Sequence, residues 1–366
     1  MHALKRFGTA FGGYKMMENY PVPECGPDDI ILEIKAAAIC GADMKHWGVD
    51  NGYDDTNITP DQQQSVRGHE FAGEIVKVGE NVKEWHIGQR VVSDNSAHVC
   101  GVCPACEQGD FLCCEHKVNL GLDNNTWGGG FSKYCKVPGE ILAIHKHAIW
   151  EIPEGIKYEE ACVLDPICNA YKAVAQQSHL IPGQDVVVFG TGPLGLFSVQ
   201  VAKLMGAVNI VMVGLDDDVK VRFGVAKELG ATHCVNGSKE DVVARCTEIC
   251  GRDNLGLVIE CSGANIALKQ AIEMTRPNAE IVRVGMGFKP LEFSINDITA
   301  WNKSIIGHMA YDSTSWRNCI RLLQSGQIKV QPMITHRLGL SQWQEGFDKM
   351  AKKEAIKVIF HYDYED

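Results

Sequence analysis

The stretch at residues 185–206 constrains the fold more than any other part of the chain. Val186 to Phe189 are four consecutive apolar residues, a pattern typical of a strand buried on both faces. An apolar helical pattern starts at Leu196 and continues to Met205. The loop between the strand and the helix has the pattern G-x-G-x-x-G and consists of Gly190, Thr191, Gly192, Pro193, Leu194 and Gly195.

Glycine suits such a loop for three physical reasons. The chain must reverse sharply, a pyrophosphate must approach bare backbone, and the following helix must pack close to the strand. The N-terminus of the helix then presents unpaired N–H groups to the phosphates. The strand before the loop and the helix after it favour a dinucleotide site over a tight turn that binds no ligand.

A dinucleotide site of this type has an acidic residue about 20 positions further on, which binds the adenosine ribose. Here Gly214 follows the second strand at that place, and it leaves room for a 2′-phosphate. Asp216, Asp217 and Asp218 come directly afterwards and would repel such a phosphate. We therefore expect Asp216 to contact the ribose, and NAD is favoured over NADP.

The pattern around this loop alternates between strand and helix. Such alternation implies a parallel sheet that is covered on both faces. The first 150 residues are instead rich in strand and turn patterns. In the alternating region we expect strands at 186–189, 209–213, 257–260, 281–284 and 304–308, and helices near 195–205, 217–229, 239–250 and 265–275.

Length, charge and cysteine content exclude several classes of protein. A chain of 366 residues is long enough for about two domains. Its net charge of −11 argues against nucleic acid or an anionic membrane as the main partner. We find no signal peptide and no apolar stretch of membrane-spanning length. Without an export signal, the 15 cysteines indicate thiols and metal ligands in a cytoplasmic protein.

Residues 98–116 contain five cysteines and little hydrophobic periodicity, so a ligand must organise them. Four thiolates at short spacing suit a closed tetrahedral zinc site, although an iron–sulfur cluster also uses four cysteines. Cys113, which precedes Cys114, is not expected to be a ligand. The expected ligands are Cys100, Cys103, Cys106 and Cys114.

A second group of candidate ligands is dispersed in the sequence. A lone cysteine such as Cys40 is often an apolar filler, and a lone histidine such as His69 often belongs to the core. Taken with Glu70 and Asp165, they supply one thiolate, one imidazole and carboxylates. That is a catalytic type of zinc set, which leaves a position for water or substrate. Glu70 is either a ligand or an outer-shell residue, and Asp43 is placed to hold an imidazole in one tautomer.

These motifs, in this order, resemble those of the zinc-containing medium-chain dehydrogenases, in particular the sorbitol, butanediol and threonine branches. The resemblance covers essentially the whole chain. It implies an α/β fold in which a Rossmann domain with a doubly wound parallel sheet, residues 167–302, is inserted into a GroES-like β-rich catalytic domain formed by 1–166 and 303–366. It also implies an active site in the cleft between the domains and a homodimer or homotetramer.

The resemblance carries over residue by residue. Cys40 and His69 match the catalytic zinc ligands, and Asp165 stands where relatives have the third ligand. Glu70 matches a glutamate that can itself bind zinc in polyol dehydrogenases. Two zinc ions per chain are implied, one catalytic and one structural. Zinc would lower the pKa of a substrate hydroxyl, and the nicotinamide of NAD(P) would accept a hydride from the same carbon.

Two departures from the family pattern affect the proton route. Ala42 stands where relatives usually have Ser or Thr, and it cannot pass on a proton. Lys45 stands where the sorbitol and threonine types tend to have His, and His46 follows one position later. A route through His46, Glu70, water or a coenzyme ribose hydroxyl is therefore a hypothesis.

The substrate is expected to be a small hydroxylated molecule. Glu70, a carboxylate as third ligand and the polar loop at residues 50–64 favour the polyol branch. The whole sequence resembles the erythritol and threitol dehydrogenases, which act on four-carbon polyols. Oxidation of an amino-alcohol such as threonine, or of butanediol or another sugar alcohol, remains an alternative. Loss of Cys40 or His69 would indicate a catalytically silent relative, and both residues are present.

Overall fold

The computed structural model describes residues 1–7, 13–44, 47, 64–123, 126–287 and 289–365. The chain forms two compact units, Met1–Asp165 together with Ile334–Asp366, and Pro166–Met333. Residues 303–333, which the sequence analysis assigns to the returning segment, cluster with the second unit. The physical reason is that both ends of this segment bond to the second unit. Residues 304–307 pair with a strand of its sheet. The Gln200 side chain, on helix α6 (Pro193–Leu204), donates to the Lys329 carbonyl and accepts from the Lys329 N–H.

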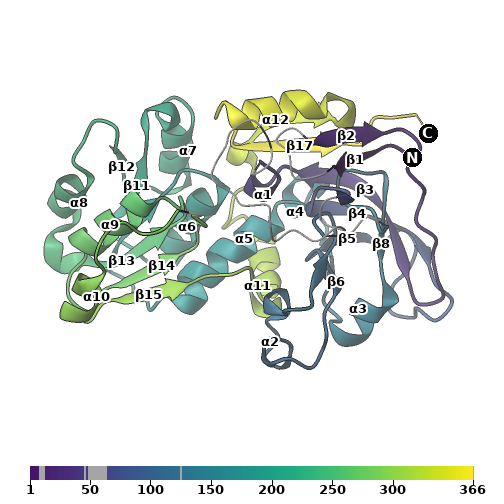
Figure 1. Ribbon diagram of the computed structural model, residues 1–366, viewed down its shortest axis with the longest axis horizontal. Coiled ribbons are helices and arrows are strands. Elements are labelled where there is room, and N and C mark those ends of the chain that lie inside the picture. Colours follow the sequence, from purple (N-terminus) through teal and green to yellow (C-terminus); the bar gives the residue numbers. More distant parts are fainter. Residues whose placement is uncertain (8–12, 45–46, 48–63, 124–125, 288, 366) are drawn as a thin grey trace. The chain divides into compact units, whose positions relative to one another are not determined.

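The first unit is built on a seven-stranded sheet whose order is β16-β17-β3-β4-β5-β9, with β8 paired to β3 (Figure 1). β3 and β4 form its long central antiparallel pair, in which the middle of β3 and the second half of β4 alternate in burial, whereas the ends at Ala38 and Glu70 are buried continuously. The sheet strands are β3 (Ile30–Ala38), β4 (Glu70–Val78), β5 (Arg90–Ser93), β8 (Tyr134–Val137), β9 (Ile149–Glu151), β16 (Ile334–Gly339) and β17 (Lys357–His361).

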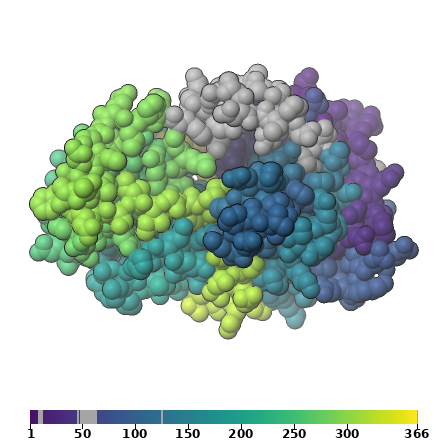
Figure 2. Space-filling view, turned by 60° about the horizontal axis from the view of Figure 1, so that its bottom comes forward, coloured from purple at the N-terminus to yellow at the C-terminus, as the bar shows by residue number. Residues whose placement is uncertain are grey.

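Short elements complete the first unit. The lobe at residues 98–116 lies at its surface and is dark blue in Figure 2. The core beneath the sheet is aromatic and aliphatic, with Phe71, Phe131 and Phe347 fully buried. The remaining elements are β1 (Ala3–Arg6), β2 (Tyr14–Met17), α1 (Gly41–Met44), β6 (Ser96–His98), α2 (Pro104–Glu107), the 3-10 helix η3 (Phe111–Cys113), β7 (Val118–Asn119), α3 (Gly139–Ile144), α4 (Tyr158–Ala161), the 3-10 helix η8 (Leu340–Gln342) and α12 (Trp343–Ala351). The 3-10 helix η7 (Gln331–Met333) ends the second unit.

The second unit contains a six-stranded sheet in the order β12-β11-β10-β13-β14-β15, and every neighbouring pair is parallel (Figure 1). Successive strands are added on one side of β10 up to β12 and on the other side from β13 to β15. Open α/β sheets bind ligands at the switch point between two such halves, which here lies between β10 and β13. The strands are β10 (Asp185–Phe189), β11 (Ile210–Gly214), β12 (His233–Asn236), β13 (Leu255–Glu260), β14 (Glu280–Arg283) and β15 (Ser304–Gly307).

Helices cover both faces of this sheet. Val187 and Phe189 of β10 pack into a cluster with α8 and α9, whereas the alternate residues of the strand face the side where α6 contacts β10. All five residues of β10 are buried, as the apolar run predicts. The helices are α5 (Leu164–Tyr171), its π-helical continuation (Lys172–Gln177), α6 (Pro193–Leu204), α7 (Arg222–Leu229), α8 (Val242–Cys250), α9 (Asn265–Met274), α10 (Asn296–Ala300) and α11 (Ser313–Gln324), with the 3-10 turns Asp216–Asp218 and Arg252–Asn254.

The α/β fold, which comprises a unit with a Rossmann-like parallel sheet and a β-rich unit, confirms the expected fold class. Strand β12 was not expected from the sequence, because its short run begins with His233 and ends with Asn236. In the part of the chain that the structure describes, no helix is both long and apolar enough to cross a membrane.

Candidate metal centres and coenzyme loop

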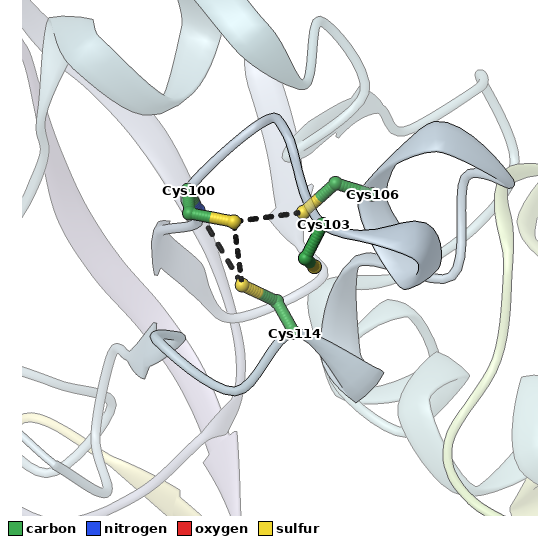
Figure 3. A group of neighbouring side chains, drawn as sticks. All are labelled: Cys100, Cys103, Cys106 and Cys114. Atoms are coloured by element: carbon green, nitrogen blue, oxygen red, sulfur yellow. Dashed lines mark hydrogen bonds between the residues drawn. The ribbon is translucent and has the colours of Figure 1, made fainter.

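The four cysteines of the lobe converge on one point (Figure 3). Their sulfur atoms all lie within 4.8 Å of one another. Cys100 Sγ is 3.6 Å from Cys114 Sγ and 4.0 Å from Cys106 Sγ. Cys113 is exposed and is not a member of the group. The structure therefore brings together the four residues that the spacing singles out.

The geometry of this cluster fits a zinc ion. A tetrahedral site with Zn–S bonds of about 2.3 Å requires sulfur atoms about 3.8 Å apart, which is close to the two distances above. Hydrogen bonds from backbone N–H groups lower the pKa of Cys100 to about 6, which favours its thiolate. Burial and the neighbouring sulfurs raise the pKa of Cys106 to about 12, so without a cation the four sulfurs do not all ionise.

The second group lies at the end of the β3–β4 hairpin. Ala38 pairs with Glu70 across the two strands, so Cys40, two residues beyond Ala38, comes close to His69 and Glu70. Cys40, His69 and Glu70 each direct one ligand atom to a common point, and these atoms lie within 4.8 Å of one another. Antiparallel pairing thus joins two motifs that are far apart in the sequence.

Two buried atoms of this group have no hydrogen-bond partner among the described residues. They are Glu70 Oε1 and His69 Nδ1, and the two residues are only 1% and 4% exposed. Buried polar atoms are normally satisfied, so two unsatisfied atoms in a group that also contains a thiol are consistent with a bound ion. A thiol, an imidazole and a carboxylate are a donor set that zinc prefers. The residues present therefore fit a metal ion.

Lys357 is the functional candidate that the sequence analysis missed. Its side chain is 1% exposed, donates to the Ile39 carbonyl at 3.2 Å and forms an ion pair with Glu70 Oε2. Burial alone would lower the pKa of Lys357, but Glu70 and Cys40 raise it above its ordinary value, so the lysine is charged. The signal in the sequence is that Lys357 is the one charged residue in the apolar run at residues 356–360.

Asp43 supports the second group from behind. Its carboxylate accepts a hydrogen bond from the Cys40 backbone N–H at 3.0 Å and is fully buried. Asp43 Oδ1 lies 3.9 Å from His69 Nδ1, which is too long for a hydrogen bond. Arg67 Nη2 lies 3.3 Å from the same oxygen, so this buried arginine, which the sequence analysis also missed, balances the charge of Asp43.

Asp165 lies in the first turn of α5 and completes the set expected from the sequence. Its Oδ2 accepts a hydrogen bond from Asn95 Nδ2 at 3.1 Å. It acts electrostatically on Cys40, Glu70 and Lys357, although it lies outside the compact three-residue group. His46 lies outside the described residues.

The glycine loop in the second unit begins directly after β10. Gly190 has a left-handed φ of +93°, and a Cβ atom at Gly195 would lie 1.8 Å from the Gly190 carbonyl oxygen. Both positions therefore require glycine. Gly192 caps α6 and has open space where a Cβ would be, so a ligand can approach its backbone. Pro193 and Leu194 form the first turn of α6, where helix N–H groups are available to phosphate.

Asp216 lies two residues beyond the end of β11. Its carboxylate accepts hydrogen bonds from Asn236 Nδ2 at 2.7 Å and is 3.3 Å from Lys239 Nζ. These two partners lower the pKa of Asp216, so it is ionised. At Gly214 a Cβ would lie 3.0 Å from Asp218 Oδ2, and a carboxylate therefore already occupies the space beside this glycine.

Comparison with known proteins identifies the class that this fold and these sites define. The model of the alcohol dehydrogenase GroES-like domain matches residues 26–147, and that of the zinc-binding dehydrogenases matches residues 193–325. The chain belongs to the zinc-type medium-chain alcohol and polyol dehydrogenases, and it is an oxidoreductase of that family.

Individual relatives span the full length of the chain. It is 77% identical to the uncharacterized zinc-type alcohol dehydrogenase-like protein YdjL of Escherichia coli K12, over 100% of both chains. It is 30% identical to sorbitol dehydrogenase of Halalkalibacterium halodurans, over 98% of both. The crystal structure of 2R,3R-butanediol dehydrogenase from Bacillus subtilis has a TM-score of 0.83 at 29% identity and covers 99% of both chains.

Proposed function

We propose that this protein oxidises a secondary alcohol of a small polyol to a ketose, with NAD as hydride acceptor. Cys40, His69 and Asp165, together with Glu70, hold the catalytic zinc ion, and the four lobe cysteines hold a structural one. The suggested substrates are four-carbon polyols such as erythritol or threitol. The sorbitol dehydrogenase relative supports a polyol as the class of substrate.

The observation that carries this proposal is the pair of unsatisfied buried atoms on His69 and Glu70 beside the Cys40 thiol. The local charges support it as well. A divalent cation and the Lys357 ammonium together would neutralise one thiolate and the carboxylates of Glu70 and Asp165. Burial raises the pKa of the Cys40 thiol and of the Glu70 carboxyl, so a cation at this site would stabilise the anionic forms that burial disfavours.

A zinc ion at this site would polarise a substrate hydroxyl and lower its pKa. The residues of the chain prepare that site. Asp43 fixes the Cys40 backbone, and the ion pair with Lys357 holds Glu70 through Oε2, which leaves the buried Oε1 without a partner among the described residues and available to the metal ion. Because Ala42 has no hydroxyl, we propose that the proton leaves through His46, Glu70, water or a coenzyme ribose hydroxyl.

The acidic surface beside Gly214 supports NAD rather than NADP. Asp216 is ionised, and Asp218 Oδ2 fills the space next to Gly214, so a 2′-phosphate there would meet two carboxylates. Asp216 is the residue we assign to the adenosine ribose. Initial rates with both coenzymes test this assignment, and a large preference for NADP would contradict it.

The substrate assignment is tested by following absorbance at 340 nm with the zinc-loaded protein. The panel contains erythritol, D- and L-threitol, sorbitol, 2,3-butanediol and L-threonine. We expect the highest kcat/KM with a tetritol. A higher value with L-threonine would replace the polyol by an amino-alcohol, and no reduced coenzyme from any alcohol would refute an alcohol-oxidising function.

A pair of cysteine variants controls for the loss of a thiol. Cys40→Ser removes a proposed ligand of the catalytic zinc ion, and we expect it to abolish the activity. Cys113→Ser changes an exposed thiol that belongs to neither cysteine group, and we expect it to retain the activity. Equal activity of the two variants would contradict the proposed site.

We also propose that the protein assembles into a homodimer or homotetramer. Strand β15 is the last strand of the second unit's sheet, and among the described residues its one neighbour is β14. Ile305 on this strand and Met309 just after it are 38% and 41% exposed. Unpaired, partly apolar strand edges favour pairing with another chain. Light scattering coupled to gel filtration tests this proposal, and a monomer mass would refute it.

A further inference from the structure

A two-residue corner in the first unit connects the two metal centres. Asp94 and Asn95 lie between β5 and β6 and are 3% and 4% exposed. Asn95 has a left-handed φ of 61°, which asparagine tolerates better than most residues. Its backbone N–H donates to Ser93 Oγ at 2.9 Å, and its carbonyl accepts from the Leu120 N–H at 2.6 Å. These two bonds fix the backbone from which its side chain projects.

Asn95 reaches the catalytic group through its side-chain amide. Its Nδ2 donates to Asp165 Oδ2 at 3.1 Å. The amide is a neutral donor, so it orients the carboxylate without neutralising the negative charge that a metal ion requires. Glu70 is likewise held through one oxygen, because Lys357 pairs with its Oε2 while the buried Oε1 has no hydrogen-bond partner among the described residues.

Asp94 ties the same corner to the four-cysteine lobe. Its Oδ2 lies 2.5 Å from His145 Nε2, and its Oδ1 accepts from the Ser96 N–H at 2.9 Å. The His145 ring packs on the ring of Phe111 with centroids 4.2 Å apart. The Phe111 carbonyl in turn accepts from the backbone N–H of Cys114, which is one of the lobe cysteines.

From these contacts we propose that Asn95 is a positioning residue for Asp165, and that the four-cysteine lobe holds Asn95 in place through Phe111, His145 and Asp94. The lobe therefore contributes to metal binding at the catalytic centre as well as to its own folding. This inference rests on the proposed function, in which Asp165 is a zinc ligand. Outer-shell partners of metal ligands commonly change metal affinity by about 10–100-fold.

Two substitutions at Asn95 separate the side chain from the backbone. Asn95→Gly removes the amide while glycine keeps the left-handed φ without strain. Asn95→Asp keeps the size but places a second carboxylate against Asp165. We expect zinc affinity at the catalytic site to fall about 10–100-fold in Asn95→Gly and further in Asn95→Asp, as measured by competition with a chromogenic chelator. The affinity of the four-cysteine site should stay within about threefold of the unmodified protein.

The second unit offers a matched control. Asn209 Nδ2 also donates to an aspartate, Asp185 Oδ2, at 3.1 Å, and neither residue belongs to a metal group. Asn209→Ala removes this equivalent hydrogen bond, and we expect both zinc affinities to remain unchanged. The connection to the lobe is tested by combining Phe111→Ala with Asn95→Gly. If the lobe acts through Asn95, the losses in zinc affinity are less than additive.

The outcomes distinguish the inference from the proposed function. If Asp165→Ala weakens one zinc site and Asn95→Gly does not, the ligand assignment stands and the positioning role is refuted. If Asp165→Ala leaves both zinc affinities unchanged, the ligand assignment fails and the inference fails with it. Fully additive losses in the Phe111 and Asn95 double variant refute the path from the lobe. Asn95→Asp decides the positioning role if Asn95→Gly does not fold.

Discussion

Replacing Lys357 by methionine tests the buried charge balance at the catalytic centre. Methionine keeps most of the length of the side chain but leaves Glu70 without its cationic partner. Breaking a buried ion pair from one side costs about 3–5 kcal/mol. For a domain of about 150–250 residues each kcal/mol lowers Tm by about 2–4 °C, so the zinc-depleted variant should melt about 6–20 °C lower.

The double variant separates charge from packing. Adding Glu70→Gln to Lys357→Met removes the uncompensated carboxylate, and we expect most of the lost Tm to return. Lys303→Met is the control, because Lys303 is also buried and donates to a carbonyl, that of Ile272, in the second unit. Adding Glu70→Gln to Lys303→Met should not raise the Tm of that variant. Differential scanning calorimetry compares Lys357→Met and Lys303→Met, each with and without Glu70→Gln, with the unmodified protein. If Glu70→Gln restores none of the Tm that Lys357→Met loses, the reasoning is refuted.

Three further perturbations have defined outcomes. Gly195→Ala places a Cβ 1.8 Å from the Gly190 carbonyl oxygen, so NADH binding followed by fluorescence should be lost; retained binding contradicts the loop's role. Burial and a nearby lysine lower the pKa of His308 to about 4, so stability should fall by up to about 3 kcal/mol between pH 6.5 and 4. His308→Asn should make the free energy of unfolding, measured by urea titration, less dependent on pH in this range. An unchanged pH dependence contradicts the prediction. Cys106→Ser should lose one zinc ion by elemental analysis and Cys113→Ser none; equal zinc contents contradict the lobe assignment.

The parts of the fold that depend on local pattern follow from the sequence. The apolar run before Gly190 predicts a strand buried on both faces, and β10 has that burial. Pro166 lies in the first turn of α5, where a proline is tolerated because the N–H that it lacks would have no partner within the helix. Strand β12 has no such pattern, because only Cys234 and Val235 lie between its polar ends.

The parts of the site that depend on tertiary contacts do not follow from the sequence. The cysteine spacing is local, so four ligands could be named from it. Lys357 meets Glu70 only when β17 pairs beside β3, and Asn95 meets Asp165 only when the corner after β5 reaches α5. Lys357 is the first residue of β17, and Asn95 lies between β5 and β6. Their burial becomes evident only in the folded chain.

Anomalous diffraction at the zinc absorption edge, from crystals of the zinc-loaded protein, tests the central claim most directly. The account predicts two peaks per chain. One lies about 2.0–2.3 Å from ligand atoms of Cys40, His69 and a carboxylate, and the other lies at the same range from the four lobe sulfurs. A map with a peak among the lobe cysteines and none beside His69 would contradict the account.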